Sequence, residues 1–160
     1  MKRVLTAFIL IFFPLICVNA NMISFFIIET GLPENPDNNT GHIHSILWES
    51  AFMDVFFDAG FIVSNAPIMR LEEKPSGDIL KTAMINLQDI REWGIDYIIV
   101  TQLDYLNDGK NPSSVLFLVY SITPEEKILE KNVKRTLNKN PKDEYEDLKA
   151  IVKGLVPFIK

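Results

Sequence analysis

The stretch IIVTQLDYLNDG, Ile98 to Gly109, decides how the fold is interpreted. Its apolar start is followed by three polar side chains, Thr101, Gln102 and Asp104. Polar residues beyond the carboxyl end of a strand mark ligand sites in open α/β sheets, whereas along a plain hairpin they alternate outward into water. The continuation, NDGKNPSS and then VLFLVYSI, is typical of a turn and a returning strand. We therefore predict that Gln102 and Asp104 share one face of a hairpin strand and point into water.

Working outward from this hairpin, the patterns predict a single α/β (α+β) domain with a mixed β-sheet of about five strands. The predicted order is βαβαβββα, with the helices packed on the sheet. The expected strands are residues 22–29, 61–67, 96–106, 115–122 and 127–137, and the expected helices are residues 43–59, 78–93 and 143–156. Gly60 and Gly94 are the predicted helix stops, and Ser76 is the predicted N-cap of the second helix. Residues 69–77 are expected to form a connection without a strand, and Pro157 to end or kink the last helix.

The first twenty residues have the three parts of a secretory signal peptide. A basic start is followed by an uncharged stretch, residues 4–18, and then by Asn19 and Ala20. We expect cleavage after Ala20, which divides the chain into a signal peptide, residues 1–20, and an envelope domain, residues 21–160. Two alternatives remain open: Cys17 is lipidated, or the apolar stretch stays uncleaved as a membrane anchor.

Cys17 is the single cysteine, so a chain cleaved after Ala20 has none. Zinc clusters of cysteines and thiol nucleophiles are then excluded. An exported domain without disulfides relies on its hydrophobic core for stability. About 140 residues form one domain of ordinary size, large enough to bury such a core.

The charges of the chain are unevenly distributed. After cleavage, 14 basic and 21 acidic residues remain, a net charge of −7; residues 21–126 carry −11 and residues 127–160 carry +4. An acidic body argues against nucleic acid as a partner, because phosphate binding requires concentrated Lys and Arg. The basic segment is interpreted as a solvated strand and helix face, with contact to an anionic surface as the alternative.

The search for catalytic chemistry finds little. The histidines, His42 and His44, could ligate a metal with Glu49 only if the chain around them were extended, and we interpret them as residues at the start of a helix. A Ser-His-acid triad would need one of these histidines as its base, and no nucleophile elbow, phosphate-binding loop or zincin motif accompanies them. The acids Asp54 and Asp58 have the spacing of a solvated helix face. We therefore expect a protein that is not an enzyme and needs no cofactor or metal.

The first helix is the most informative feature for function. One wide apolar face is suited to packing on the sheet: Trp48, Ala51, Phe52, Val55, Phe56 and Ala59. A second, heptad-like stripe consists of Ile43, Ile46, Met53 and Phe57. Glu49 and Asp54 separate the two faces. Because a helix that is apolar on two sides needs two partners, either another helix of the same domain covers the stripe or a second protein does.

Residues 93–133 carry a family resemblance. The segments WGIDYIIVTQLDY and VLFLVYSITPEEKILEKNV resemble a pattern of bacterial envelope proteins related to the TolB N-terminal domain, the peptidoglycan-synthase activator LpoB and the curli channel protein CsgG. The matching residues are Gly94, Asp96 and Tyr97, and FFDAGFIV, residues 56–63, resembles the helix-to-strand joint before them. The chain departs from the pattern at Thr123-Pro124-Glu125, which replaces a Thr-Gly turn, and in lacking a lipobox around Cys17. The resemblance implies a non-catalytic envelope adaptor with helices covering a sheet.

Together these observations predict an exported, periplasmic or envelope-associated module that binds another envelope protein or forms a homodimer. It would contact the membrane only through a lipid anchor or an uncleaved signal. The alternative function is binding of a small molecule or cell-wall fragment by residues 30–41 and 65–74. A catalytic function ranks third, because the sequence offers no assembled base, nucleophile or metal cluster.

Overall fold

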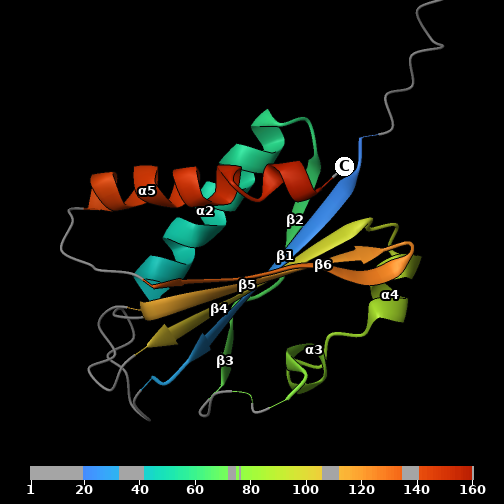
Figure 1. Cartoon of the computed structure of the whole chain (residues 1–160), viewed down its shortest axis with the longest axis horizontal. Coiled ribbons are helices and arrows are strands. Elements are labelled where there is room, and N and C mark those ends of the chain that lie inside the picture. The colour runs from blue at the N-terminus through green and yellow to red at the C-terminus, as the bar shows by residue number, and fades with distance from the viewer. Residues whose placement is uncertain are drawn as a thin grey trace, which may run out of the picture.

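The computed structural model describes residues 20–32, 42–71, 75, 77–105, 112–134 and 141–159. In these residues a six-stranded mixed sheet has α2 and α5 on one face and the short helices α3 and α4 on the other (Figure 1). The elements are β1 (Met22–Thr30), α2 (His42–Asp58), β2 (Ile62–Asn65), β3 (Met69–Leu71), α3 (Ile79–Thr82), α4 (Leu87–Glu92), β4 (Tyr97–Tyr105), β5 (Pro112–Ile122), β6 (Glu125–Lys134), α5 (Pro141–Lys153) and the 3-10 helix η2 (Val156–Phe158). The predicted α/β single-domain class is confirmed.

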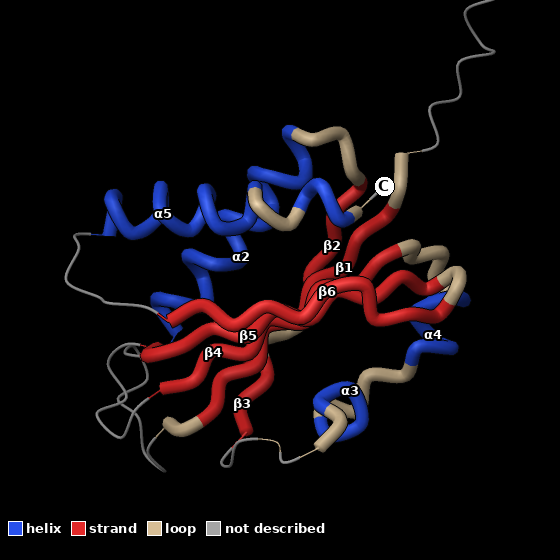
Figure 2. The backbone as a smooth tube through the Cα atoms, in the orientation of Figure 1, coloured by secondary structure: helices blue, strands red, loops and turns tan. Residues whose placement is uncertain are grey.

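The strands are arranged in the order β2-β1-β4-β5-β6, and β3 pairs with the second half of β1 beyond β2. β1 runs parallel to β2, β3 and β4, while β4, β5 and β6 form antiparallel hairpins. Figure 2 shows these strands side by side in one sheet. Parallel neighbours require crossover connections, which α2 and the α3–α4 segment supply. As a consequence, β1, β3 and β4 end at the same edge of the sheet.

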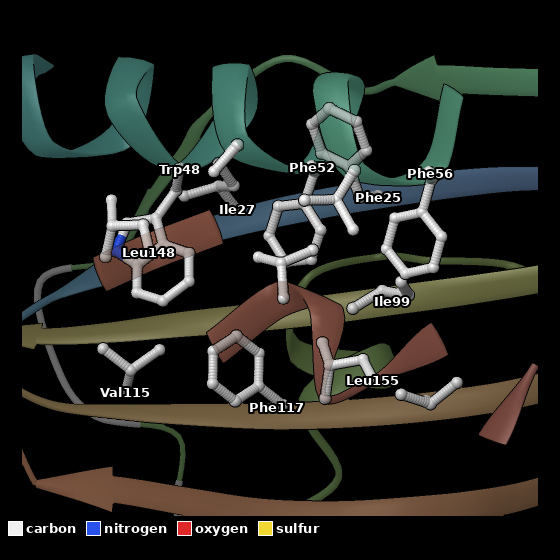
Figure 3. Close-up of a cluster of buried hydrophobic side chains, with 14 of the residues drawn as sticks. Phe25, Ile27, Trp48, Phe52, Phe56, Ile99, Val115, Phe117, Leu148 and Leu155 are labelled. Atoms are coloured by element: carbon white, nitrogen blue, oxygen red, sulfur yellow. The ribbon is translucent and has the colours of Figure 1, made fainter. Parts of the chain in front are cut away.

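One half of the core lies between the sheet and the helices α2 and α5. Trp48, Phe52 and Phe56 project from successive turns of α2 toward the strands (Figure 3). The predicted wide face is buried except at Ala59, which follows the end of α2 and is exposed. The Phe52 ring stacks on Phe25 of β1 at a centroid distance of 5.2 Å and meets the edge of Phe117 of β5 at 6.4 Å. Leu148, Val152 and Leu155 close this half of the core from the α5 side.

The opposite face of the sheet is covered by two short helices, where the sequence predicted one helix over residues 78–93. The Asp78 side chain caps α3 by accepting from the Leu80 amide, and the Asn86 side chain caps α4 by accepting from the Gln88 amide. Met84 between them has φ = +53°, a left-handed conformation that no continuous helix contains. The prediction of one helix, with Ser76 as its cap, was wrong because local side-chain capping outweighs the apolar periodicity.

Two further predictions were wrong in detail. Residues 69–71 form β3, although their connection was expected to contain no strand, because β1 is longer than β2 and leaves backbone groups that β3 satisfies. Pro67 separates the two short strands, since proline has no amide hydrogen for the ladder. At the other end of the chain α5 ends at Lys153, and Pro157 lies in η2.

A helix that spans a membrane must be both long and apolar. Among the described residues, no helix meets both requirements.

Candidate functional site

The predicted second stripe, which we call the α2 stripe, consists of Ile43, Ile46, Met53 and Phe57. It belongs to α2, and its described side chains face away from the sheet. Its described side chains are exposed: 44% for Ile46, 40% for Met53 and 72% for Phe57. The side chain of Ile43 lies outside the described residues, although its backbone belongs to α2. Three large apolar side chains on one exposed helix face form a candidate contact surface. Among the described residues, no other helix of the domain buries these three side chains.

Helix α5 packs beside α2. The Tyr145 hydroxyl donates to the Asp54 carboxylate, and Lys149 Nζ lies 3.3 Å from the same carboxylate. The hydrogen bond to Asp54 raises the pKa of Tyr145 to about 12, and the same bond is the main cause of a lowered pKa of Asp54. On the other flank, Asn65 Nδ2 donates to Glu49 at 3.1 Å. The two acids that border the stripe are thus held in place, which gives the apolar surface fixed edges.

A buried polar cluster lies where α2 begins, above the carboxyl ends of β1 and β4. Glu29, at the end of β1, is fully buried, accepts a hydrogen bond from Ser45 and pairs with Arg70 Nε at 2.7 Å. A buried carboxylate needs such partners, because leaving a charge unpaired in the core is strongly unfavourable. The cluster therefore joins β1, β3 and α2. The sequence analysis missed it, although a lone acid ending the apolar strand ISFFII was a signal.

His44 belongs to the same region but makes a different contact from the one considered for a metal. Its Nδ1 lies 2.9 Å from the Glu144 carboxylate, and both residues are buried. This pair ties the first turn of α2 to the first turn of α5. Glu49 contacts Asn65 instead, and the side chain of His42 lies outside the described residues. Within the described part of the chain, no three His, Cys, Asp or Glu residues are grouped to hold a metal ion.

Tyr105 closes the cluster, and burial raises its pKa, with the charge of Glu29 adding to the shift. Below pH 10, Tyr105 is protonated in both the folded and the unfolded protein, and its burial contributes fully to stability. Above pH 10 the unfolded state loses its proton first, so stability falls as pH rises. We expect the free energy of unfolding to decline as the pH rises above about 10, and to decline less in Tyr105→Phe. Chemical denaturation at several pH values measures both; equal slopes would contradict the burial of the phenol.

The polar residues of the opening stretch lie inside the protein. Gln102 is only 4% exposed, and its Nε2 donates to the Thr30 hydroxyl at 3.3 Å. Asp104 is partly buried beside Thr30 and Ser114. The prediction that Gln102 points into water was wrong, because β4 is a central strand with β1 on one side and β5 on the other, and α3 lies beneath it. The predicted alternation holds, since Gln102 faces away from the Leu103 side of the core.

Other predicted site residues lie partly outside the described residues. This applies to Cys17 and to the other residues of the predicted signal peptide before Ala20. It also applies to residues 33–41 and 72–74 of the alternative ligand-binding segments. Residues 65–69 of those segments are described, and they line a cavity on the α3–α4 side of the sheet. The structure therefore contains two separate candidate surfaces, the α2 stripe and this cavity.

Solved structures with a similar fold are found among bacterial proteins. The chain aligns with a PelC dodecamer from Paraburkholderia phytofirmans with a TM-score of 0.51 and 17% identity, over 87% of this chain and 88% of that one. It aligns with TolB from Acinetobacter baumannii with a TM-score of 0.46 and 16% identity, over 86% of this chain but only 29% of TolB. Lipoprotein GNA1162 from Neisseria meningitidis aligns with a TM-score of 0.38 and 13% identity, over 86% and 99% of the two chains.

The resemblance drawn from the sequence is confirmed at the level of the fold, because the chain has an α/β fold that aligns with PelC over most of both chains. No curated protein matches the chain by sequence. A family described as "Uncharacterised protein" matches residues 34–115, which is just over half of the 160 residues. The chain therefore belongs to this family.

Proposed function

We propose that the chain is an exported cell-envelope protein that works without catalysis, by associating with further copies of itself through the α2 stripe. The observation that carries the proposal is the exposure of Ile46, Met53 and Phe57 on a helix whose other face is fully buried. Apolar side chains gathered on one face are a common feature of interfaces between subunits. A second copy of the chain is the occupant that the following features favour.

The first supporting feature is the fold, because the PelC structure that aligns over most of both chains is a dodecamer. A ring of identical subunits uses two different surfaces on each subunit, one contacting the next copy and one contacting the previous copy. The second feature is charge. The α2 stripe is bordered by Glu49 and Asp54 within an acidic body, whereas residues 127–160 carry a net charge of +4 and include the exposed Lys131 and Lys134 of β6. Opposite charges on separate parts of one chain favour head-to-tail contact.

We expect Met53→Asp combined with Phe57→Asp to abolish association, because two carboxylates would have to be buried without partners in the contact. Sedimentation velocity of the wild type and the variant measures this result. The matched control is Met84→Asp, which places a charge on an exposed methionine of the opposite face and should leave association unchanged. Thermal unfolding by circular dichroism distinguishes loss of contact from loss of fold. If the double variant unfolds, or associates like the wild type, the α2 stripe is not the contact surface.

Export is the second part of the proposal, and the pattern of residues 1–20 supports it. We expect the protein recovered from the envelope of its host to have the intact mass of residues 21–160. A larger mass that corresponds to a chain beginning at Cys17 with a lipid attached would show a membrane-tethered protein instead of a free one. Finding the protein only in the soluble cytoplasmic fraction, with the mass of the whole chain from Met1, would contradict export.

A further inference from the structure

A cavity of about 650 Å³ lies on the face of the sheet opposite α2. Its base is formed by Ser24 and Phe26 of β1, one side by residues 64–69, and the other side by residues 83–86 and by α4 (Figure 1 shows α3 and α4 on this face). Two helices of four and six residues leave part of the sheet uncovered, which is how the hollow arises. Its volume falls within the range of small-molecule sites, about 300–1,000 Å³.

Two large apolar side chains at the rim of the cavity are not part of the hydrophobic core. Trp93 is 66% exposed and Met84 is 90% exposed, and both line the cavity. The left-handed backbone of Met84 ends α3 and holds its side chain outside the core. The lining beneath them is mainly apolar, with Phe26, Ile68 and Ile90 among its members. An apolar group entering the cavity would therefore gain contact on its sides as well as at its base.

The charge of the cavity is set by one residue. Asp89 is the single ionisable side chain among the described residues that line it. Asp89 lies in the first turn of α4 and Trp93 is its C-cap residue, four positions later, a spacing that places side chains on the same face of a helix. The basic residue of the same helix, Arg91, contacts Glu125 and the Ile122 carbonyl instead. The cavity thus joins a carboxylate, an indole and an apolar interior, and no described Lys or Arg lines it.

We propose that this cavity binds a small organic cation, an apolar group that carries a primary or quaternary ammonium. The indole of Trp93 attracts a cation through its π face, and the Asp89 carboxylate adds a charge of opposite sign within the same site. Several neutral polar groups nearby already make one hydrogen bond each: Ser64 donates to the Ile23 carbonyl, Asn65 donates to Glu49, and Asn86 accepts from the Gln88 amide. A ligand that needed many hydrogen bonds, such as a saccharide, would find few groups free to make them.

The test uses the protein as it is recovered from its host and three probes: hexyltrimethylammonium, 1-hexanol and N-acetylglucosamine. Nuclear magnetic resonance of the indole N–H of Trp93 reports occupancy, and Trp93→Phe assigns its signal. We expect hexyltrimethylammonium to bind about tenfold more tightly than hexanol, since a cation at an aromatic face and a carboxylate adds this much. Asp89→Asn should reduce that preference severalfold while hexanol binding persists. Glu92→Gln, which neutralises the neighbouring acid outside the cavity lining, should leave it unchanged.

Three results would overturn the proposal. The first is equal affinity for the ammonium and the alcohol, the second is binding of the saccharide in preference to both, and the third is the absence of any change at Trp93. The outcome does not depend on association through the α2 stripe, because Met53→Asp with Phe57→Asp alters the other face of the sheet and should leave ammonium binding intact. Failure of one proposal is therefore distinguishable from failure of the other.

Discussion

Phe52→Ala is expected to lower the free energy of unfolding by about 3–5 kcal/mol, the usual cost of removing a buried phenyl ring. Phe52 is fully buried, stacks on Phe25 and on Phe56, and meets the edge of Phe117. Its removal leaves a hole among rings from α2, β1 and β5 that rigid strands cannot close. Denaturation by urea measures the change, with protein dilute enough that association does not contribute to stability.

Phe57→Ala is the matched control on the same helix. The two phenylalanines are five residues apart, but Phe57 is 72% exposed and belongs to the α2 stripe. Its replacement should change the free energy of unfolding of the dilute protein by no more than about 0.5 kcal/mol, while weakening association. Similar losses of stability for both variants would show that the two faces of α2 have been assigned incorrectly.

Gly31→Ala should be the second strongly destabilising change, with a loss of about 2–4 kcal/mol. Gly31 has φ = +73°, and a Cβ atom there would overlap the main-chain carbonyl oxygen of Tyr105. The left-handed conformation disfavours any side chain, and the overlap adds a displacement of β1 from β4. Thermal and urea denaturation measure the loss.

Gly60→Ala separates the two causes. Gly60 also has a left-handed backbone, φ = +89°, but no atom lies within 4 Å of the position that a Cβ would take. Its replacement should therefore cost only the conformational part, about 1–2 kcal/mol. If Gly31→Ala and Gly60→Ala destabilise equally, the close approach of β1 to the Tyr105 carbonyl is absent in solution.

Periodicity predicted the elements that bury a long apolar face. The strand of residues 22–29 and the helix of residues 43–59 were predicted nearly to their observed bounds, because their apolar residues repeat over several turns or pleats. The short elements were predicted poorly. β3 is three residues long and α3 is four, so neither repeats its period often enough to produce a recognisable pattern, and both depend on neighbours that are distant in sequence.

The candidate sites also differ in whether local sequence spacing predicts them or whether they depend on residues that are distant in sequence. The α2 stripe was found from sequence because all its members lie on one helix, where spacing fixes direction. The contacts Glu29–Arg70 and His44–Glu144 join residues 41 and 100 positions apart, and nothing in local spacing indicates them. The sequence predicts that Gln102 is exposed to solvent because the hairpin of its strand is visible in the sequence and the pairing with β1 is not. That pairing makes β4 a central strand of the sheet.

The central claim, association through the outer face of α2, is tested most directly by sedimentation velocity of the chain that begins at Asn21, measured over a wide range of concentrations beside the Met53→Asp, Phe57→Asp variant. We expect the wild type to sediment as an assembly whose mass increases with concentration, and the folded variant to sediment as a monomer at every concentration. A wild type that remains monomeric throughout, or a folded variant that assembles like the wild type, would contradict the claim.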